Sequence, residues 1–293
     1  MAASIPARGA LGIRKEESFA SGGVIDSWQV IESANIVKTN QFIFEDRIRN
    51  TPEQVSGTYS QTMVSGPITF PVSPANPTQW WRCGIGGTGP YTPQRPLSSM
   101  AMEIQEGDIA AVYSSGDMIS RLELSSRQGE ILRCNVNVEG KDLAARVTPS
   151  SVSFASGDDP YLHSECTFTL DGVANSQVTA FSVAIDNSLV TDLFANNRAR
   201  RDILATKAVV NGSISILFED TTFRNRFMNA LPSAITAQYI RGGRSFKIEL
   251  VRLAYDSSDR NMQGQTSYIT ETLTFTAYVD DPSSQNSLKL TVV

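Results

Sequence analysis

Apolar and polar residues alternate along most of this chain from Trp28 onward. Isoleucine, valine, threonine and aromatic residues recur at every second position, and glycine, asparagine, aspartate and serine interrupt the runs. Alternation with a period of two is typical of a β-strand that buries one face. The chain is therefore predicted to be mainly β. The expected strands are 59–72, 100–104, 119–124, 131–138, 166–170, 178–185, 209–218, 246–253 and 267–279.

Two short stretches have the pattern of a helix instead. Residues 76–84 (NPTQWWRCG) begin with an asparagine before a proline, which suits a helix start, and end at a glycine. Residues 221–231 (TTFRNRFMNAL) begin with a threonine and place Phe223, Phe227 and Leu231 four positions apart. Both stretches follow a predicted strand, so each predicts a short helix beside a sheet.

The second half of the chain resembles the first half at a shift of 146 positions. Each matched strand keeps its alternation, so the same face is predicted to be buried in both copies. A further match has a shift of 141, which we attribute to shorter loops in the second copy. The chain is therefore predicted to contain two similar β units. The matches are 62–72 over 208–218 and 100–104 over 246–250 at the first shift, and 130–138 over 271–279 at the second.

Composition divides the chain into four parts. Residues 1–23 are small and polar with four glycines, and we expect an N-terminal arm that is ordered only by a partner. The two predicted β units are 24–147 and 161–293. Between them, residues 148–160 (TPSSVSFASGDDP) are rich in serine, proline and aspartate, which predicts a linker.

Two long polar segments occupy similar places in the two units. Residues 41–58 and 187–203 mix a few large apolar residues with arginines and have no clean periodicity. Two alternatives are open: each is a plain surface hairpin, or each is a loop ordered by another subunit. The second alternative gives eight candidates for contacts between subunits or between rings. They are Phe42, Phe44, Arg47, Arg49, Leu189, Phe194, Arg198 and Arg200.

Charge and motifs exclude several classes of function. The formal net charge of −5 argues against an electrostatic grip on nucleic acid. Residues 84–89 (GIGGTG) match a dinucleotide-binding string, but the prolines at 90, 93 and 96 prevent the helix that such a site requires. The single histidine, His163, has no nucleophile motif beside it, and we expect it on the surface or in a hydrogen bond. No catalytic residue, cofactor site, metal site or membrane span is predicted.

Six segments carry recognisable patterns of strand and turn: 12–18 (GIRKEES), 65–70 (SGPITF), 122–132 (LELSSRQGEIL), 138–141 (VEGK), 178–187 (VTAFSVAIDN) and 210–220 (VNGSISILFED). With these segments the chain resembles the major tail tube proteins of long-tailed, siphovirus-like bacteriophages, in the larger group with a duplicated tube domain. The resemblance implies two tube-type units, each a β-sandwich or barrel with a short flanking helix and long loops.

The resemblance also implies a function and partners. It implies a virion structural protein, not an enzyme, whose stacked rings form the tail tube and conduct DNA from the capsid to the host. The expected partners are further copies of the chain, the tape measure protein, the tail terminator and the distal tail or baseplate proteins. DNA is expected to pass through the lumen without sequence-specific binding. The expected location is the virion tail, after assembly in the host cytoplasm.

Two questions have competing answers at this point. If each unit fills one position of a six-fold ring, three chains close the ring as a homotrimer with pseudo-six-fold symmetry. The rival is a hexamer in which one half decorates the outside. The alternative function is a carbohydrate-binding β-sandwich module of a phage receptor-binding or decoration protein. In that alternative Trp80 and Trp81 stack on sugar rings, although aromatic residues in such a short helix are more often core.

Overall fold

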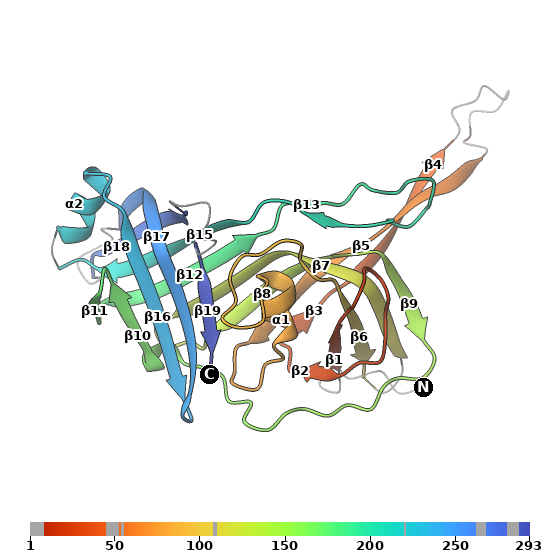
Figure 1. Cartoon of the computed structure of the whole chain (residues 1–293), viewed down its shortest axis with the longest axis horizontal. Helices are drawn as coiled ribbons and strands as arrows, with labels where there is room; N and C mark the ends of the chain where they lie inside the picture. The colour runs from red at the N-terminus through yellow and green to blue at the C-terminus, as the bar shows by residue number, and fades with distance from the viewer. Residues whose placement is uncertain are drawn as a thin grey trace.

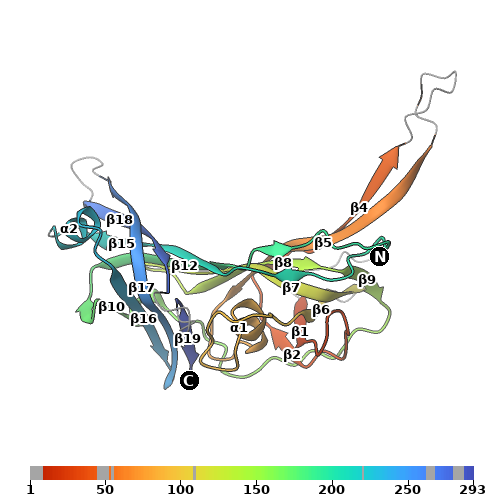
Figure 2. The same cartoon turned by 45° about the horizontal axis from the view of Figure 1, so that its top comes forward.

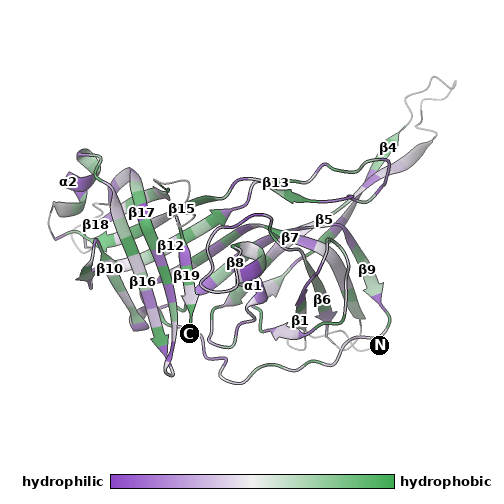
Figure 3. Ribbon diagram, viewed as in Figure 1, coloured by the Kyte–Doolittle hydropathy of each residue, from purple (hydrophilic) through white to green (hydrophobic). Residues whose placement is uncertain are grey.

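The computed structural model describes residues 9–44, 53, 56–107, 110–219, 221–261, 268–279 and 287–293. The chain is mainly β, as the alternation predicted, and its antiparallel strands form two lobes at opposite ends of the long axis (Figure 1). We call residues 10–146 the first lobe and residues 163–292 the second lobe. Colouring by hydropathy shows the apolar and polar residues alternating along the strands of the second lobe (Figure 3).

The first lobe contains nine strands and one helix among its described residues. In chain order they are β1 (Ala10–Lys15), β2 (Ser27–Gln29), β3 (Ser33–Ala34), β4 (Val37–Phe44), β5 (Gly57–Pro71), α1 (Gln79–Gly84), β6 (Met100–Glu106), β7 (Ala110–Arg127), β8 (Arg133–Gly140) and β9 (Asp142–Arg146).

The second lobe begins with a 3₁₀ turn, η2 (His163–Glu165), after residues 148–160, which contain no helix or strand. The elements that follow η2 are β10 (Cys166–Leu170), β11 (Val173–Asn175), β12 (Val178–Asp186), β13 (Leu189–Val190), β14 (Leu204–Ala205), β15 (Val209–Leu217), α2 (Thr222–Met228), β16 (Ser233–Arg241), β17 (Arg244–Asn261), β18 (Thr270–Ala277) and β19 (Lys289–Val292).

Both predicted helices are present as α1 and α2. The helix α1 begins at Gln79 and not at Asn76, because the Asn76 side chain instead accepts a hydrogen bond from the backbone N–H of Ser73.

The order of strand pairing in the first lobe recurs in the second. In the first lobe β1 pairs with β2 and β6, and the pairing continues through β7 and β8 to β5, which pairs with β3 and β4. In the second lobe β10 pairs with β11 and β16, and the pairing continues through β17 and β18 to β15, which pairs with β12. The helix α1 packs against β7, and α2 packs against β17.

The correspondence extends to single residues, because two β-bulges fall at matching places. A bulge inserts one extra residue into a strand and bends it, so its position fixes the local register. Each lobe has one bulge where its long strand (β7 or β17) meets the preceding strand and a second where it meets the following strand. The first pair of bulges lies between Met100 and Met102 and between Ser233 and Ile235, and the second pair between Ile119 and Arg121 and between Tyr255 and Ser257.

Gly66 and Gly212, which the shift of 146 places over each other, have the same surroundings. A Cβ atom at Gly66 would collide with the carbonyl oxygen of Asn35, and one at Gly212 with that of Ser182. Both carbonyls belong to the segment that pairs beside the glycine's strand, so each position requires a residue without a side chain. The shift of 146 thus superposes equivalent positions of β5 and β15.

The other two sequence matches are wrong in position. Across the sheet, Val138 lies opposite Gly66 and Phe275 opposite Gly212, so the shift from β8 to β18 is 137 and not 141. Residues 246–250 lie in β17, whereas the counterpart of β6 by pairing is β16. Strands with the same alternation resemble one another whatever their neighbours, and only the pairing distinguishes them.

The prediction that residues 1–23 form an arm ordered only by a partner is also wrong in part. Residues 10–15 form β1, and Leu11 and Ile13 are completely buried in the main core. Leu11 and Ile13 sit on either side of Gly12, so this strand has a core-facing side that the small, polar composition of the segment obscures. Its own chain therefore orders this part of the segment.

The two lobes share one core. β12 pairs with β15 on one side and with β7 of the first lobe on the other, from Ala180 opposite Arg127 to Asp186 opposite Arg121. The apolar cluster continues across this junction, where the rings of Trp81 and Phe246 lie 5.3 Å apart. The lobes are therefore held together by a continuous sheet and by side-chain packing.

Asp117 of β7 is fully buried at the bulge next to Met100. Its Oδ1 atom accepts a hydrogen bond from the hydroxyl of Ser114 at 2.7 Å, and its Oδ2 atom has no partner in the described part of the chain. Burial raises the pKa of Asp117 from 3.8 to about 8, and the Ser114 hydrogen bond only partly opposes this. The folded protein thus holds Asp117 as a neutral acid at pH 7.

We expect Asp117→Asn to change how stability depends on pH. The carboxyl is protonated in the folded chain and ionised in the unfolded chain between pH 4 and pH 8, so this group lowers stability as pH rises, by about 1.4 kcal/mol per pH unit. Asparagine does not titrate. The unfolding free energy of the variant relative to the wild type should therefore rise across this window in urea titrations. If the unfolding free energies of the two proteins changed with pH in parallel, Asp117 would not be a neutral acid in the folded protein.

Candidate assembly surfaces

The hairpin of β4 and β5 carries an exposed aromatic cluster. It projects away from the sheets of both lobes (Figure 2). Phe42 lies opposite Tyr59 across the hairpin, and its ring is 4.9 Å from that of Tyr59 and 4.8 Å from that of Phe44. Phe44 is 52% exposed and Tyr59 56% exposed. Such a grouped apolar surface on a projecting element is typical of a contact with another molecule.

The described part of segment 41–58 is thus a hairpin, and its own lobe leaves it exposed. Every residue of β4 is exposed, and within the described residues its side-chain contacts outside the hairpin include those of Lys38 with Asp142 and Leu143 of β9. Two of the candidate contact residues, Arg47 and Arg49, lie outside the described residues.

The segment 187–203 begins as the small hairpin strand β13 and then runs beside β5 (Figure 1). The carbonyl of Arg198 accepts a hydrogen bond from the backbone N–H of Thr62 at 2.8 Å. Leu189 packs against a small apolar cluster of Leu97, Met118 and Ile203. Phe194 is half-buried and the Arg198 side chain is exposed. The base of this segment is therefore ordered by its own chain.

Arg200 is held by its own chain, contrary to the expectation of a subunit contact. Its side chain is almost fully buried, and its Nη1 atom lies 2.9 Å from the carboxylate of Glu139. The same atom donates to the carbonyl oxygen of Gly140 at 3.0 Å and approaches that of Val64 at 3.4 Å. Arg200 therefore fastens the segment to the ends of β5 and β8.

Two strand edges lack a partner strand among the described residues. β3 and β4 pair only with β5, and Tyr255–Asn261 of β17 pairs only with β18. Their counterparts in the recurring pattern, β12 and Arg121–Ser125 of β7, have partner strands on both sides. An open edge exposes unpaired N–H and C=O groups, which bind another strand readily.

His163 belongs to a buried hydrogen-bond chain. Its Nε2 atom lies 3.0 Å from the carbonyl oxygen of Val178, so Nε2 carries the proton, because a carbonyl only accepts. Its Nδ1 atom lies 3.0 Å from the hydroxyl oxygen of Ser126, which in turn lies 2.7 Å from the hydroxyl oxygen of Tyr239. No carboxylate takes part in this network of His163, Ser126 and Tyr239. The prediction of a hydrogen-bonded histidine is confirmed, and the arrangement joins η2 to β7 and β16.

Trp80 and Trp81 are core residues. Their side chains are 0% and 1% exposed, and the Trp80 ring stacks on Phe70 at 4.9 Å while its Nε1 donates to Gln29. Neither ring is available to a sugar, which removes the platform that the carbohydrate-binding alternative required.

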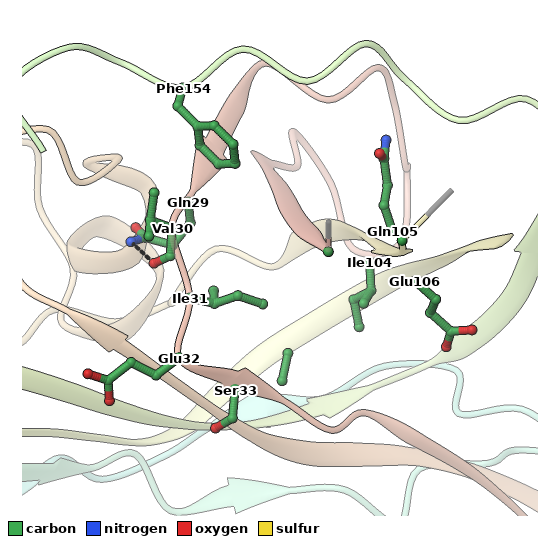
Figure 4. A pocket seen from close by; sticks show the side chains of 12 residues that line it. Gln29, Val30, Ile31, Glu32, Ser33, Ile104, Gln105, Glu106 and Phe154 are labelled. Carbon is green, nitrogen blue, oxygen red and sulfur yellow. Dashed lines mark hydrogen bonds between the residues drawn. The ribbon is translucent and has the colours of Figure 1, made fainter. Parts of the chain in front are cut away.

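A pocket of about 670 Å³ lies between β2–β3 and the end of β6 (Figure 4). Phe154, from the segment between the lobes, extends over Ile31 and Ile104 in this view. Among the described residues no group of three acidic, cysteine or histidine side chains is placed to hold a metal ion. Within the same ranges no helix has the length and apolar character of a membrane span.

Comparison with known families decides the identity of this fold. The family model described as "Phage tail tube protein" matches residues 6–277 of the 293. The chain belongs to the phage tail tube protein family. A comparison with curated proteins gives no significant match. Family membership supports a phage tail structural protein, with the exposed hairpin and the open edges as its candidate assembly surfaces.

Sequence reasoning missed the two open edges. β4 (VKTNQFIF) has four consecutive polar residues and was taken partly into a loop, and the outer half of β17 (YDSSDRN) is almost wholly polar. Comparison with the bulges and strand pairing of the other lobe identifies both edges, but that pairing is known only from the three-dimensional structure.

We expect Arg200→Ala to destabilise this tail tube protein by about 1–3 kcal/mol, because the carbonyl oxygens that Arg200 binds lose their buried donor. Arg198→Ala is the matched control in the same segment. It removes an exposed side chain and keeps the backbone hydrogen bond to Thr62, so it should change stability by less than about 0.5 kcal/mol. Urea denaturation of both variants measures the difference. Equal effects would contradict the fastening role of Arg200.

Proposed function

We propose that this chain builds the tube of a phage tail as stacked rings that conduct DNA from the capsid to the host. Family membership supports the tail, and the two open strand edges support assembly with further copies. In this proposal the protein is structural and not an enzyme. The mild net negative charge, −5, suits a conduit, because a basic lumen would retain DNA.

We further propose that the two lobes are copies of one tube unit. The boundaries are those expected from the sequence, 24–147 and 161–293, with β1 added to the first unit. The recurring order of pairing, the matching bulges and the shared glycine positions support this division. Each chain then supplies two of six positions in a ring, and three chains form a homotrimer with pseudo-six-fold symmetry.

The proposal assigns partners beyond the ring. The aromatic hairpin, with Phe42 and Phe44 and the adjoining Arg47 and Arg49, is proposed to contact the next ring or subunit, together with Leu189, Phe194 and Arg198. At the two ends of the tube the tail terminator and the distal tail or baseplate proteins bind, and the tape measure protein occupies the lumen before DNA. Assembly takes place in the host cytoplasm and the product is part of the virion tail.

The number of chains in each ring tests this function. We expect native mass spectrometry of released rings, or image averaging without imposed symmetry, to give three chains, because each chain fills two positions. A ring of six chains would contradict the trimer and favour the rival in which one half decorates the outside. Isolated globules at all concentrations would contradict the tube.

Hydrogen exchange tests the role of the hairpin. In single chains the amides of β4 should exchange fast, since the strand is exposed along its whole length. In assembled tubes they should become protected. The amides around Arg200, which its own chain already holds, serve as the control and should be protected equally in both states. Fast exchange of β4 in the tube would count against a subunit contact.

A further inference from the structure

The two open edges correspond, strand for strand, to the two strands that join the lobes. β12 and β7 make the junction within the chain. By the recurring pattern, the counterpart of β12 is the segment β3–β4, and the counterpart of β7 is β17. A repeat of the same junction between two chains would therefore pair β3–β4 of one copy with β17 of the next.

The register of that repeat follows from pairings already described. Val37 lies opposite Ser65 of β5, and Ala184 lies opposite Asn211 of β15. Ser65 and Asn211 are equivalent, because each precedes the glycine, Gly66 or Gly212, that needs a bare backbone. Val37 therefore occupies the place of Ala184.

The same reasoning applies to the long strands. Glu123 lies opposite Asn135 of β8, two residues beyond the bulge at Arg121, and Asp259 lies opposite Thr272 of β18, two residues beyond the bulge at Ser257. Asp259 therefore occupies the place of Glu123. Within the chain, Ala184 and Glu123 are direct partners in the antiparallel junction.

We propose that β3–β4 of one copy pairs antiparallel with the outer half of β17 of the next copy, with Val37 opposite Asp259. This inference rests on the proposed ring and specifies its contact between chains. The neighbouring pairs in this register are Asn35 with Asn261, Ile36 with Arg260, Lys38 with Ser258 and Thr39 with Ser257.

The placement of the edges fits such a contact. β4 and β17 lie in opposite lobes, near opposite ends of the molecule (Figure 1). One chain thus offers two different edges, and each edge fits the other edge of a second copy. A contact of this head-to-tail kind generates a closed ring when its rotation is suitable. The occupant of each edge is therefore a second copy of this chain.

Exposed residues beside the edges fit the same junction. Val37 is 49% exposed, whereas its counterpart Ala184 is buried. The helix α1, which flanks the inner junction, buries Trp81 against Phe246 of the other lobe. The corresponding helix α2 leaves Met228 68% exposed at the outer end of the second lobe. Val37 and Met228 are thus exposed beside the open edges, whereas the apolar residues that flank the inner junction are buried.

The open edge of β17 is more polar than the edge of β7 that pairs with β12. A strand edge that is exposed to water before assembly requires such polar residues. Leu122 and Leu124 of β7 are buried beneath the junction with β12. Their counterparts in β17 are Ser258, whose hydroxyl donates to Glu271 at 2.6 Å, and Arg260, whose guanidinium lies 4.1 Å from the ring centre of Phe218. Polar residues on an edge limit indiscriminate strand addition. The polar edge therefore suits a contact that forms only during assembly.

Cysteine cross-linking tests the register. The variant Val37→Cys with Asp259→Cys should form disulfide-linked dimers and trimers under mild oxidation, since directly opposed residues lie within disulfide reach. The matched control is Glu123→Cys with Ala184→Cys, at the same position of the inner junction, which should link only within one chain. The three native thiols give little background, because burial raises the pKa of Cys83 and Cys166 to about 12 and that of Cys134 well above its ordinary value.

Three further outcomes decide against the proposal. A second double variant, Val37→Cys with Ser257→Cys, is displaced along the strand and should cross-link less; stronger linkage than in Val37→Cys with Asp259→Cys would overturn the register. Three-membered rings in electron micrographs without that cross-link, while the inner control oxidises, would overturn the strand pairing and leave the proposed tube intact. Single chains without cross-link would overturn both.

Discussion

The pairing of β12 with β7 is the contact on which the arrangement of this tail tube protein depends. It gives β12 a partner strand on each side and joins the sheets of both lobes over seven residue positions, from Ala180 to Asp186. A sheet that continues across the junction leaves no open edge between the lobes, so the apolar core can continue beneath it. The relative placement of the lobes is thereby fixed by backbone hydrogen bonds as well as by packing.

The same junction accounts for one buried polar side chain, Asn187. Asn187 follows β12 directly, is fully buried, and donates to the carbonyl oxygens of Gly84 and Ile119 at 2.9 and 2.8 Å. Arg95 donates to the side-chain oxygen of Asn187 at 2.8 Å. Buried polar groups are retained when each finds a partner. Asn187 thus connects the end of α1, the bulged part of β7 and the start of the segment that Arg200 later fastens.

The sequence predicted the β class, both helices and most strands, because alternation and caps are local signals. Strand partners are not local, so β6 was matched with part of β17, although pairing relates it to β16. Segments with a weak pattern were missed: β1 alternates around Gly12, and β4 is largely polar. Among the site candidates, Phe42 and Phe44 lie on an exposed hairpin, and their contact with another subunit stays a prediction. Arg200 is buried within its own chain, because the carbonyl oxygens of Val64 and Gly140 that bind it come from strands distant in the sequence.

A chain with two related lobes can assign different chemistry to contacts that symmetry would otherwise make equal. In a ring of six identical units every junction must be soluble before assembly and stable after it. Here the inner junction forms once, during folding, and buries Leu122 and Leu124. In the proposed ring the outer junction carries Ser258 and Arg260 in their places. Because the linkage within the chain makes every second junction intramolecular, only three contacts have to form between molecules, and those three can remain polar enough to form reversibly.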